Sequence, residues 1–302
     1  MRHTFIALLT AGVMLAGTTG FSGEGWPTDW AQAKKTAAKE NKLILVDFSG
    51  SDWCGWCVKL DKEVFSQPAF LKGAKEKFVL MLADYPRDKS GQSEELQAQN
   101  EKLRTEFQIK GYPSVYLTTA EGKPIAKTGY EPGGPEKYLA ALEKMAQDYE
   151  DVQKLRKKLP TVQGIEKAKL LDQICKKMSI ESPEKLGYVD EILRLDADGK
   201  AGLKASYMAQ KLLPLVIGAL RSGKGQEALQ KCDEVLALEG LDTELKQTVV
   251  FFKSNAVHSM GDKPKAKDLL LEARKIDPKS DMAKNIDRIL ASDLFKEAPK
   301  DK

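Results

Sequence analysis

The sequence predicts an α/β domain followed by an all-α domain. Between Trp26 and Lys144, segments with helical spacing alternate with short apolar runs rich in strand-forming residues, which is typical of a sheet covered by helices. After about Asp148 the strand-like runs disappear, and helical periodicity continues to the end of the chain. A chain of 302 residues is long enough for two domains, and we predict that they cover residues 24–148 and 149–302.

The first domain contains four candidate strands separated by helices. Residues 29–40 are rich in alanine and lysine and predict a helix, whereas the apolar run 43–48 predicts a strand. The other expected elements, in chain order, are a helix over 57–65, a strand over 78–82, a helix over 93–107, a strand over 114–117, a turn at 121–123, a short strand around Ile125 and a helix from Pro135. This order implies a sandwich with the strands in the middle.

The second domain is divided into segments of helical length by proline and glycine. Two of these segments, 222–228 and 260–266, have the same spacing from glycine to alanine, and their alanines lie 38 residues apart, which fits a repeated helix-turn-helix unit. The run 273–278 resembles the end of a tetratricopeptide repeat, although most aromatic and Gly-Tyr positions of that repeat are missing. A tetratricopeptide-like array and a generic helical bundle both remain open.

The first 20 residues have the three parts of a secretory signal peptide. Arg2 and His3 form a cationic start, residues 5–17 are mostly apolar, and 18–20 are small. The apolar stretch is shorter than the ~20 residues needed to cross a bilayer, which disfavours a membrane anchor. Thr18 stands where a lipoprotein signal would have cysteine. We therefore expect residues 1–20 to be removed and the mature protein to be periplasmic or secreted.

The charges give no support to nucleic-acid binding. Lysine and arginine total 48 against 44 aspartate and glutamate residues. These charges are spread evenly along the chain, whereas a nucleic-acid-binding domain gathers its cations on one face.

Two of the four cysteines, Cys54 and Cys57, have an informative spacing. They follow a predicted strand and open a predicted helix. This arrangement suits disulfide exchange, because the second thiol can reach the first and the amides of a helix N-terminus favour a thiolate. We expect Cys54 to attack a client disulfide and Cys57 to resolve the mixed disulfide. Cys175 and Cys232 lie among apolar residues and are expected to be buried and inert, although a disulfide between them remains open.

The same Cys-x-x-Cys spacing also occurs in zinc sites, which need two further ligands. His3 lies in the expected signal peptide, and His258 lies far along the chain, as do the other two cysteines, so a structural zinc site is disfavoured. A copper(I) site remains an alternative because soft thiolates suit that ion. We expect no other cofactor.

Three motifs in sequence order resemble the thioredoxin family, namely the runs 44–48, 53–59 and 110–115. The run 62–68, followed by the strand at Phe78, is similar to exported thioredoxin-like proteins. The resemblance extends from about Trp26 to Met145. It implies a thioredoxin fold and a thiol:disulfide oxidoreductase that acts on protein clients and receives electrons from an upstream partner protein.

The resemblance also implies roles for individual residues. Pro113 would be the cis-proline of the family, which leaves the backbone of Tyr112 free to pair with an extended client. Asp47 would be the buried carboxylate beneath Cys57, with a raised pKa that lets it take the proton of that thiol.

Two tryptophans, Trp53 and Trp56, flank the pair and are expected to form the client-binding surface together with Tyr112. Trp56 stands where ordinary thioredoxins have proline, and one extra residue separates Asp47 from Cys54. Oxidising members of the family often have histidine between the cysteines. Its absence here favours a reductase or an isomerase.

The helical domain supports a different hypothesis. In this second hypothesis it is a protein-interaction module, and the thioredoxin-like part serves as a scaffold or redox sensor. In the enzyme hypothesis, the same domain recruits a client or partner.

Overall fold

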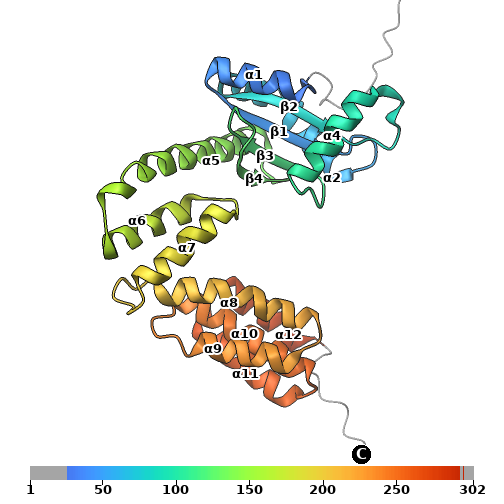
Figure 1. Ribbon diagram of the computed structural model, residues 1–302. Helices are drawn as coiled ribbons and strands as arrows, with labels where there is room; N and C mark the ends of the chain where they lie inside the picture. The colour runs from blue at the N-terminus through green and yellow to red at the C-terminus, as the bar shows by residue number, and fades with distance from the viewer. Residues whose placement is uncertain (1–25, 293–294, 296–302) are drawn as a thin grey trace, which may run out of the picture. The chain divides into compact units, whose positions relative to one another are not determined.

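The computed structural model describes residues 26–292 and residue 295, and the signal peptide expected over 1–20 lies outside them. The chain divides between Tyr149 and Glu150 into two compact units, one with helices and strands and one with helices (Figure 1). Among the described residues, no helix is both long and apolar enough to span a bilayer.

A four-stranded mixed sheet lies at the centre of the first unit. Its strand order is β2-β1-β3-β4, with β1 parallel to β2 and antiparallel to β3, and β3 antiparallel to β4. The strands are β1 (Leu43–Ser49), β2 (Phe78–Asp84), β3 (Ser114–Thr118) and β4 (Pro124–Thr128). Six of the seven residues of β1 are buried, which explains why this central strand reads as a continuous apolar run.

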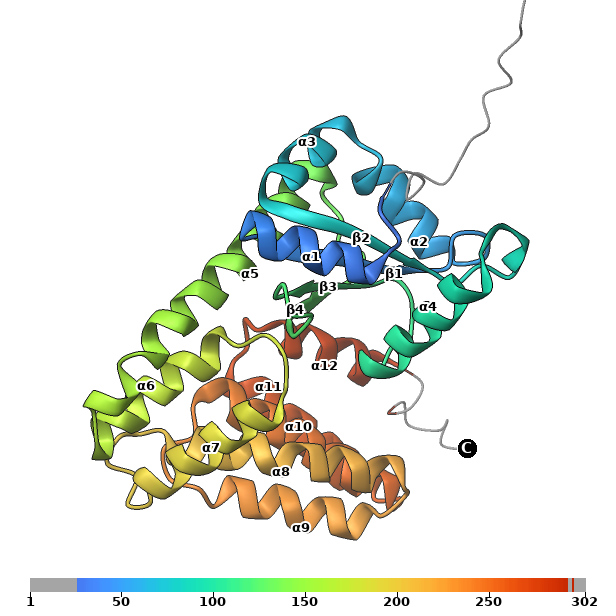
Figure 2. The same cartoon turned by 45° about the horizontal axis from the view of Figure 1, so that its top comes forward.

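Helices cover both faces of this sheet (Figure 2). They are α1 (Trp30–Glu40), α2 (Gly55–Leu60), α3 (Pro68–Lys77), α4 (Glu94–Glu106) and α5 (Gly134–Arg156). Leu45 of β1 packs in a core formed with residues of α2, α3 and α5. Phe48 instead contacts Phe107, directly after α4, so it points to the other face. Because strand residues alternate between faces, Asp47 shares the face of Leu45.

The predicted order of helices and strands is confirmed, with differences around the first helix after the cysteines. The helix expected over 57–65 begins at Gly55 and changes to a π-helical turn over Asp61–Phe65. Helix α3 was not among the expected elements. Only Phe70 and Ala74 of this helix are buried, so its apolar spacing gives little signal, although Pro68 at its first turn is typical of a helix start.

The second unit is all-helical, as predicted. Helix α5 continues to Arg156, so the boundary expected after 148 falls within a helix. The helices that follow are α6 (Gly164–Lys177), α7 (Pro183–Leu195), α8 (Lys204–Arg221), α9 (Gly225–Leu236), α10 (Thr243–Ser259), α11 (Lys263–Ile276) and α12 (Asp281–Ala291).

The two similar segments form the turns between α8 and α9 and between α10 and α11. Gly223 and Gly261 have φ angles of 68° and 91°, a region that favours glycine at the end of a helix. Ala228 and Ala266 are both fully buried, since each lies where the second helix of its pair packs. The segments therefore occupy equivalent places in two helix pairs.

Cys175 and Cys232 are free and buried, so the disulfide left open between them is not formed and the prediction of buried thiols is confirmed. Burial raises the pKa of Cys175 to about 11 and that of Cys232 to about 12. Both thiols are thus protonated at neutral pH, and a protonated thiol is a poor nucleophile.

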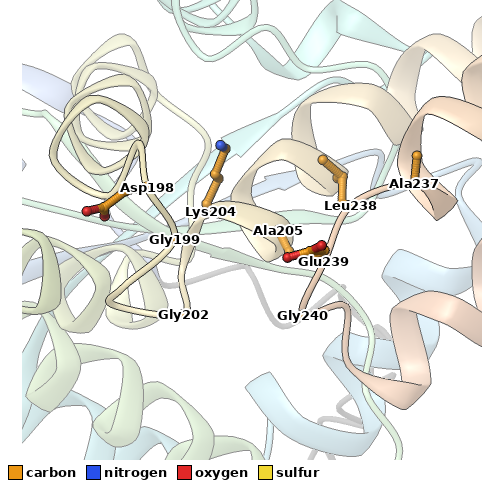
Figure 3. A pocket seen from close by; sticks show the side chains of 9 residues that line it. All are labelled: Asp198, Gly199, Gly202, Lys204, Ala205, Ala237, Leu238, Glu239 and Gly240. Carbon is orange, nitrogen blue, oxygen red and sulfur yellow. The ribbon is translucent and has the colours of Figure 1, made fainter.

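A pocket of about 490 Å³ lies between the loops that follow α7 and α9 (Figure 3). Its charged side chains are Asp198, Lys204 and Glu239, and Lys204 Nζ also donates a hydrogen bond to the Ala197 carbonyl at 2.7 Å. The pocket therefore offers both signs of charge.

Candidate active site

Cys54 and Cys57 form a disulfide at the N-terminus of α2, with their Cα atoms 5.2 Å apart. Cys54 is the N-cap residue, and its Sγ accepts a hydrogen bond from the Cys57 N–H at 3.2 Å. Cys54 is 7% exposed and Cys57 is 2% exposed. An N–H donor and the N-terminus of a helix are groups that favour a thiolate over a thiol, and both lie at Cys54 Sγ, whereas Cys57 is the more deeply buried of the two.

The loop that precedes the pair is fixed to β2. The Ser51 N–H and hydroxyl donate to the two carboxylate oxygens of Asp84 at 2.9 and 2.6 Å, and the Cys54 N–H donates to the Gly50 carbonyl at 2.9 Å. A Cβ on Gly50 would lie 2.5 Å from the Trp53 indole, so only glycine fits there without displacing the ring.

Asp47 is buried near the carboxyl end of β1, with 3% of its surface exposed. Burial, followed by the negative charges of Asp61 and Asp84, raises the pKa of Asp47 to about 8. The raised pKa agrees with the expectation. It lies close to the pKa of about 8.5 of an ordinary thiol.

Asp61 is a buried carboxylate that the sequence analysis missed. It lies one helical turn after Cys57, and its N–H donates to the Cys57 carbonyl. Residues four apart share one face of a helix, so Asp61 and Cys57 face the same side. That spacing is a signal from which Asp61 could have been found.

The Tyr112–Pro113 peptide bond is cis, as the resemblance implies. Ser114 pairs with Phe48 in the sheet, so Pro113 lies at the end of β1 from which the active-site loop begins. The neighbouring loop approaches closely, because a Cβ on Gly129 would lie 3.3 Å from the Pro113 carbonyl oxygen.

Trp53 is 39% exposed but held in place. Its Nε1–H donates to the Tyr85 carbonyl at 2.8 Å, and its ring contacts Tyr112 with centroids 5.5 Å apart and planes at 80°. Tyr112 in turn contacts Tyr85 at 5.3 Å. Two of the expected client-binding residues are therefore in contact, and Tyr85 is a neighbour that the sequence analysis missed.

Trp56 is the most exposed large apolar side chain of the site, at 58%. Its ring contacts Tyr130, with centroids 5.1 Å apart, and the Lys59 ammonium lies 5.2 Å from its centroid. Tyr130 follows β4, far along the chain from the cysteines, and sequence spacing gave no sign of it. Among the described residues, no group of three or more histidine, cysteine or acidic side chains is placed to hold a metal ion.

Comparisons with known proteins point to one family. The family model of the thioredoxin-like domain matches residues 30–146. The "Disulfide bond reductase DsbH" of Chlamydia pneumoniae is 32% identical over 113 residues, which are 37% of this chain and 68% of that relative. The "Thioredoxin-related protein DsbJ" of the same organism is 35% identical over 104 residues, which are 34% of this chain and 30% of that relative.

A third relative and a solved structure are also similar to this chain. The "Thiol:disulfide interchange protein DsbD" of Vibrio vulnificus (strain CMCP6) is 32% identical over 102 residues, which are 33% of this chain and 16% of that relative. A solved structure of "DsbH Oxidoreductase" is 27% identical, covers 46% of this chain and 92% of that chain, and has a TM-score of 0.37. Together with the Cys54–Cys57 disulfide, the family match and the DsbH match establish that this chain belongs to the thioredoxin-like family and is a thiol:disulfide oxidoreductase.

Proposed function

We propose that this protein is an exported reductase of protein disulfides. The observation that carries the proposal is the pair itself: Cys54 Sγ accepts the Cys57 N–H at the start of α2, with the exposed Trp53 directly before Cys54 and the exposed Trp56 between the two cysteines. Reduction of a client disulfide needs a stabilised thiolate as the nucleophile, a second thiol within reach of it and a surface on which the client can lie. The site offers all three.

The reaction balances within the pair and the client. The Cys54 thiolate attacks one sulfur of a client disulfide, forming a mixed disulfide and releasing the other client sulfur as a thiolate. The pKa of Asp47 is about 8, so a minor fraction of this carboxyl is ionised at neutral pH, and this form takes the proton of Cys57. Cys57 then attacks Cys54 Sγ, which releases the client's second sulfur as a thiolate and forms the Cys54–Cys57 disulfide. The client gains two electrons, and the protein is returned to the dithiol form by an upstream dithiol protein.

The roles of the remaining site residues belong to the same proposal. Pro113 and the backbone of Tyr112 hold an extended client segment beside Cys54, while Trp53 and Trp56 contact its side chains. The direction of reduction is supported by the absence of histidine between the cysteines and by the DsbH relative, whose name describes a disulfide bond reductase.

We assign the redox domain to residues 24–148 and a recruiting domain to 149–302. The repeated helix pairs support a tetratricopeptide-like role for the second domain, in which a client or partner protein binds it. The mixed charges of the pocket in Figure 3 suit a polar polypeptide segment. The three-part pattern of residues 1–20 supports export to the periplasm, where disulfide-bonded clients occur.

Reduction of a disulfide-bonded protein tests this proposal. With insulin as client and dithiothreitol as electron source, catalytic amounts of the mature protein are expected to accelerate reduction of the interchain disulfides. The same protein, pre-oxidised, is expected to be slow at introducing disulfides into a reduced, unfolded client. Faster oxidation than reduction would overturn the assigned direction, and no acceleration of either reaction would overturn the enzyme.

A further inference from the structure

Four side chains form a cluster beside the redox pair, which we call the Trp56 cluster: Trp56, Lys59, Glu63 and Tyr130. The Lys59 ammonium lies beside both rings, 5.2 Å from the Trp56 centroid and 4.9 Å from the Tyr130 centroid. The Tyr130 hydroxyl donates to Glu63 Oε2 at 2.7 Å, and Glu63 lies 3.9 Å from Lys59. Each member contacts at least two others, so the cluster holds Trp56 in one orientation.

The cluster is also tied to the rest of the domain. Tyr130 follows Gly129, whose carbonyl accepts a hydrogen bond from the Tyr138 hydroxyl of α5 at 2.9 Å. Gly129 packs against the backbone of Pro113, where a Cβ would already be too close for an ordinary contact. Tyr130 therefore reaches Trp56 from a loop whose position is set by a helix and by the cis-proline loop.

More than half of the Trp56 side chain nevertheless remains exposed. Trp56 lies two residues after Cys54 at the first turn of α2, and Trp53 lies directly before Cys54. A client sulfur that reaches the largely buried Cys54 must bring the residues next to its own cysteine over these rings. Client neighbours are thus in contact with aromatic surface on both sides of the reacting sulfur.

The charges of the cluster give a charged neighbour no net gain. The Lys59 ammonium and the Glu63 carboxylate lie 3.9 Å apart, so a client charge of either sign is attracted by one of them and repelled by the other. An aromatic ring needs no such pairing and gains the offset or edge contact that aromatic pairs prefer.

We propose that the Trp56 cluster makes this enzyme select client disulfides whose reacting cysteine has an aromatic or large aliphatic neighbour, with Tyr130 as the positioning residue. The inference rests on the proposed reductase function and adds to it the class of client. One further aromatic contact is expected to raise kcat/KM about fivefold, which corresponds to about 1 kcal/mol at 1.4 kcal/mol per factor of ten.

Two peptide substrates test this selection. Both are extended peptides that carry one mixed disulfide, and they differ only in the residue after the cysteine, which is phenylalanine in one and serine in the other. The measured quantity is the ratio of their kcat/KM values with the mature full-length protein. The wild type is expected to give a ratio of about five, mainly through a lower KM for the phenylalanine peptide.

Three variants of the cluster and one control variant locate the effect. Tyr130→Ala is expected to bring the ratio close to one, whereas Tyr130→Phe, which keeps the ring, is expected to restore most of it. Lys59→Met removes the ammonium that contacts both rings and is expected to lower the ratio. Lys127→Met is the matched control, since Lys127 lies 5.3 Å from the Tyr116 ring outside the cluster, and it is expected to leave the ratio at the wild-type value.

The outcomes distinguish a failure of client selection from a failure of the reductase function. A wild-type ratio near one, or an unchanged ratio in Tyr130→Ala, overturns the selection while leaving the reductase intact. Failure of the wild type to reduce either peptide overturns the reductase function itself.

Discussion

Replacing Asp47 with asparagine is expected to stabilise the oxidised protein, and the gain is expected to grow with pH between about 4 and 8. The pKa of Asp47 is about 8 in the folded state against 3.8 for an ordinary aspartate. Within this window the unfolded chain releases the Asp47 proton while the folded chain retains it. The free energy of unfolding of the wild type therefore falls by about 1.4 kcal/mol for each unit by which the pH rises. Over about four units the loss is at most about 6 kcal/mol, and asparagine avoids it.

Urea unfolding of wild type and Asp47→Asn at pH 4.5, 6 and 8 measures this difference. Asp52→Asn is a control of opposite sign, because hydrogen bonds from the backbone N–H groups of Arg87 and Asp88 lower the pKa of the exposed Asp52. The Asp52 carboxylate of the wild type stabilises the fold at pH values above the ordinary aspartate pKa. This stabilisation is lost as the pH falls through the lowered pKa of Asp52 in the folded state. A stability difference between wild type and Asp47→Asn that does not change with pH would contradict the account of Asp47.

Replacement of each cysteine is expected to block a different step of the reaction. Cys54→Ser removes the attacking sulfur, so turnover of a disulfide client is expected to fall at least about a thousandfold without any trapped client. Cys57→Ser leaves the attack intact but removes the resolving thiol, so mixed disulfides between Cys54 and clients are expected to accumulate.

Non-reducing electrophoresis after alkylation, followed by mass spectrometry of the linked peptides, distinguishes these results. Cys232→Ser is the matched control, because that thiol is buried and free in the second unit, and it is expected to behave as the wild type. Equal trapping by Cys54→Ser and Cys57→Ser would contradict the assignment of Cys54 as the attacking residue.

Local features of the sequence predicted most of the fold. The buried run of β1 and the helical spacing of α1 and α4 each reflect burial within one element, and such patterns are visible in the residues themselves. Helix α3 and the π-helical turn lack such a pattern. The turns at Gly223 and Gly261 were recognisable because a left-handed backbone at a helix end favours glycine.

The site was predicted only in part, for a physical reason. Cys54, Cys57 and Trp53 lie in one short run. Asp61 could have been predicted as well, because it follows Cys57 by four residues and so shares its helix face. Tyr130 and Tyr85 join the site from other loops through ring packing and a backbone carbonyl, and these contacts depend on the sheet order. Spacing in one sequence does not contain that information.

The most direct test of the central claim is an equilibrium redox titration of Cys54 and Cys57 in the mature protein, followed by the fluorescence of the adjacent tryptophans. The account predicts one reversible two-electron transition near the thioredoxin potential of about −270 mV, as a reductase requires. A transition near about −120 mV would contradict the reducing direction, and the absence of a reversible transition would contradict the redox pair itself.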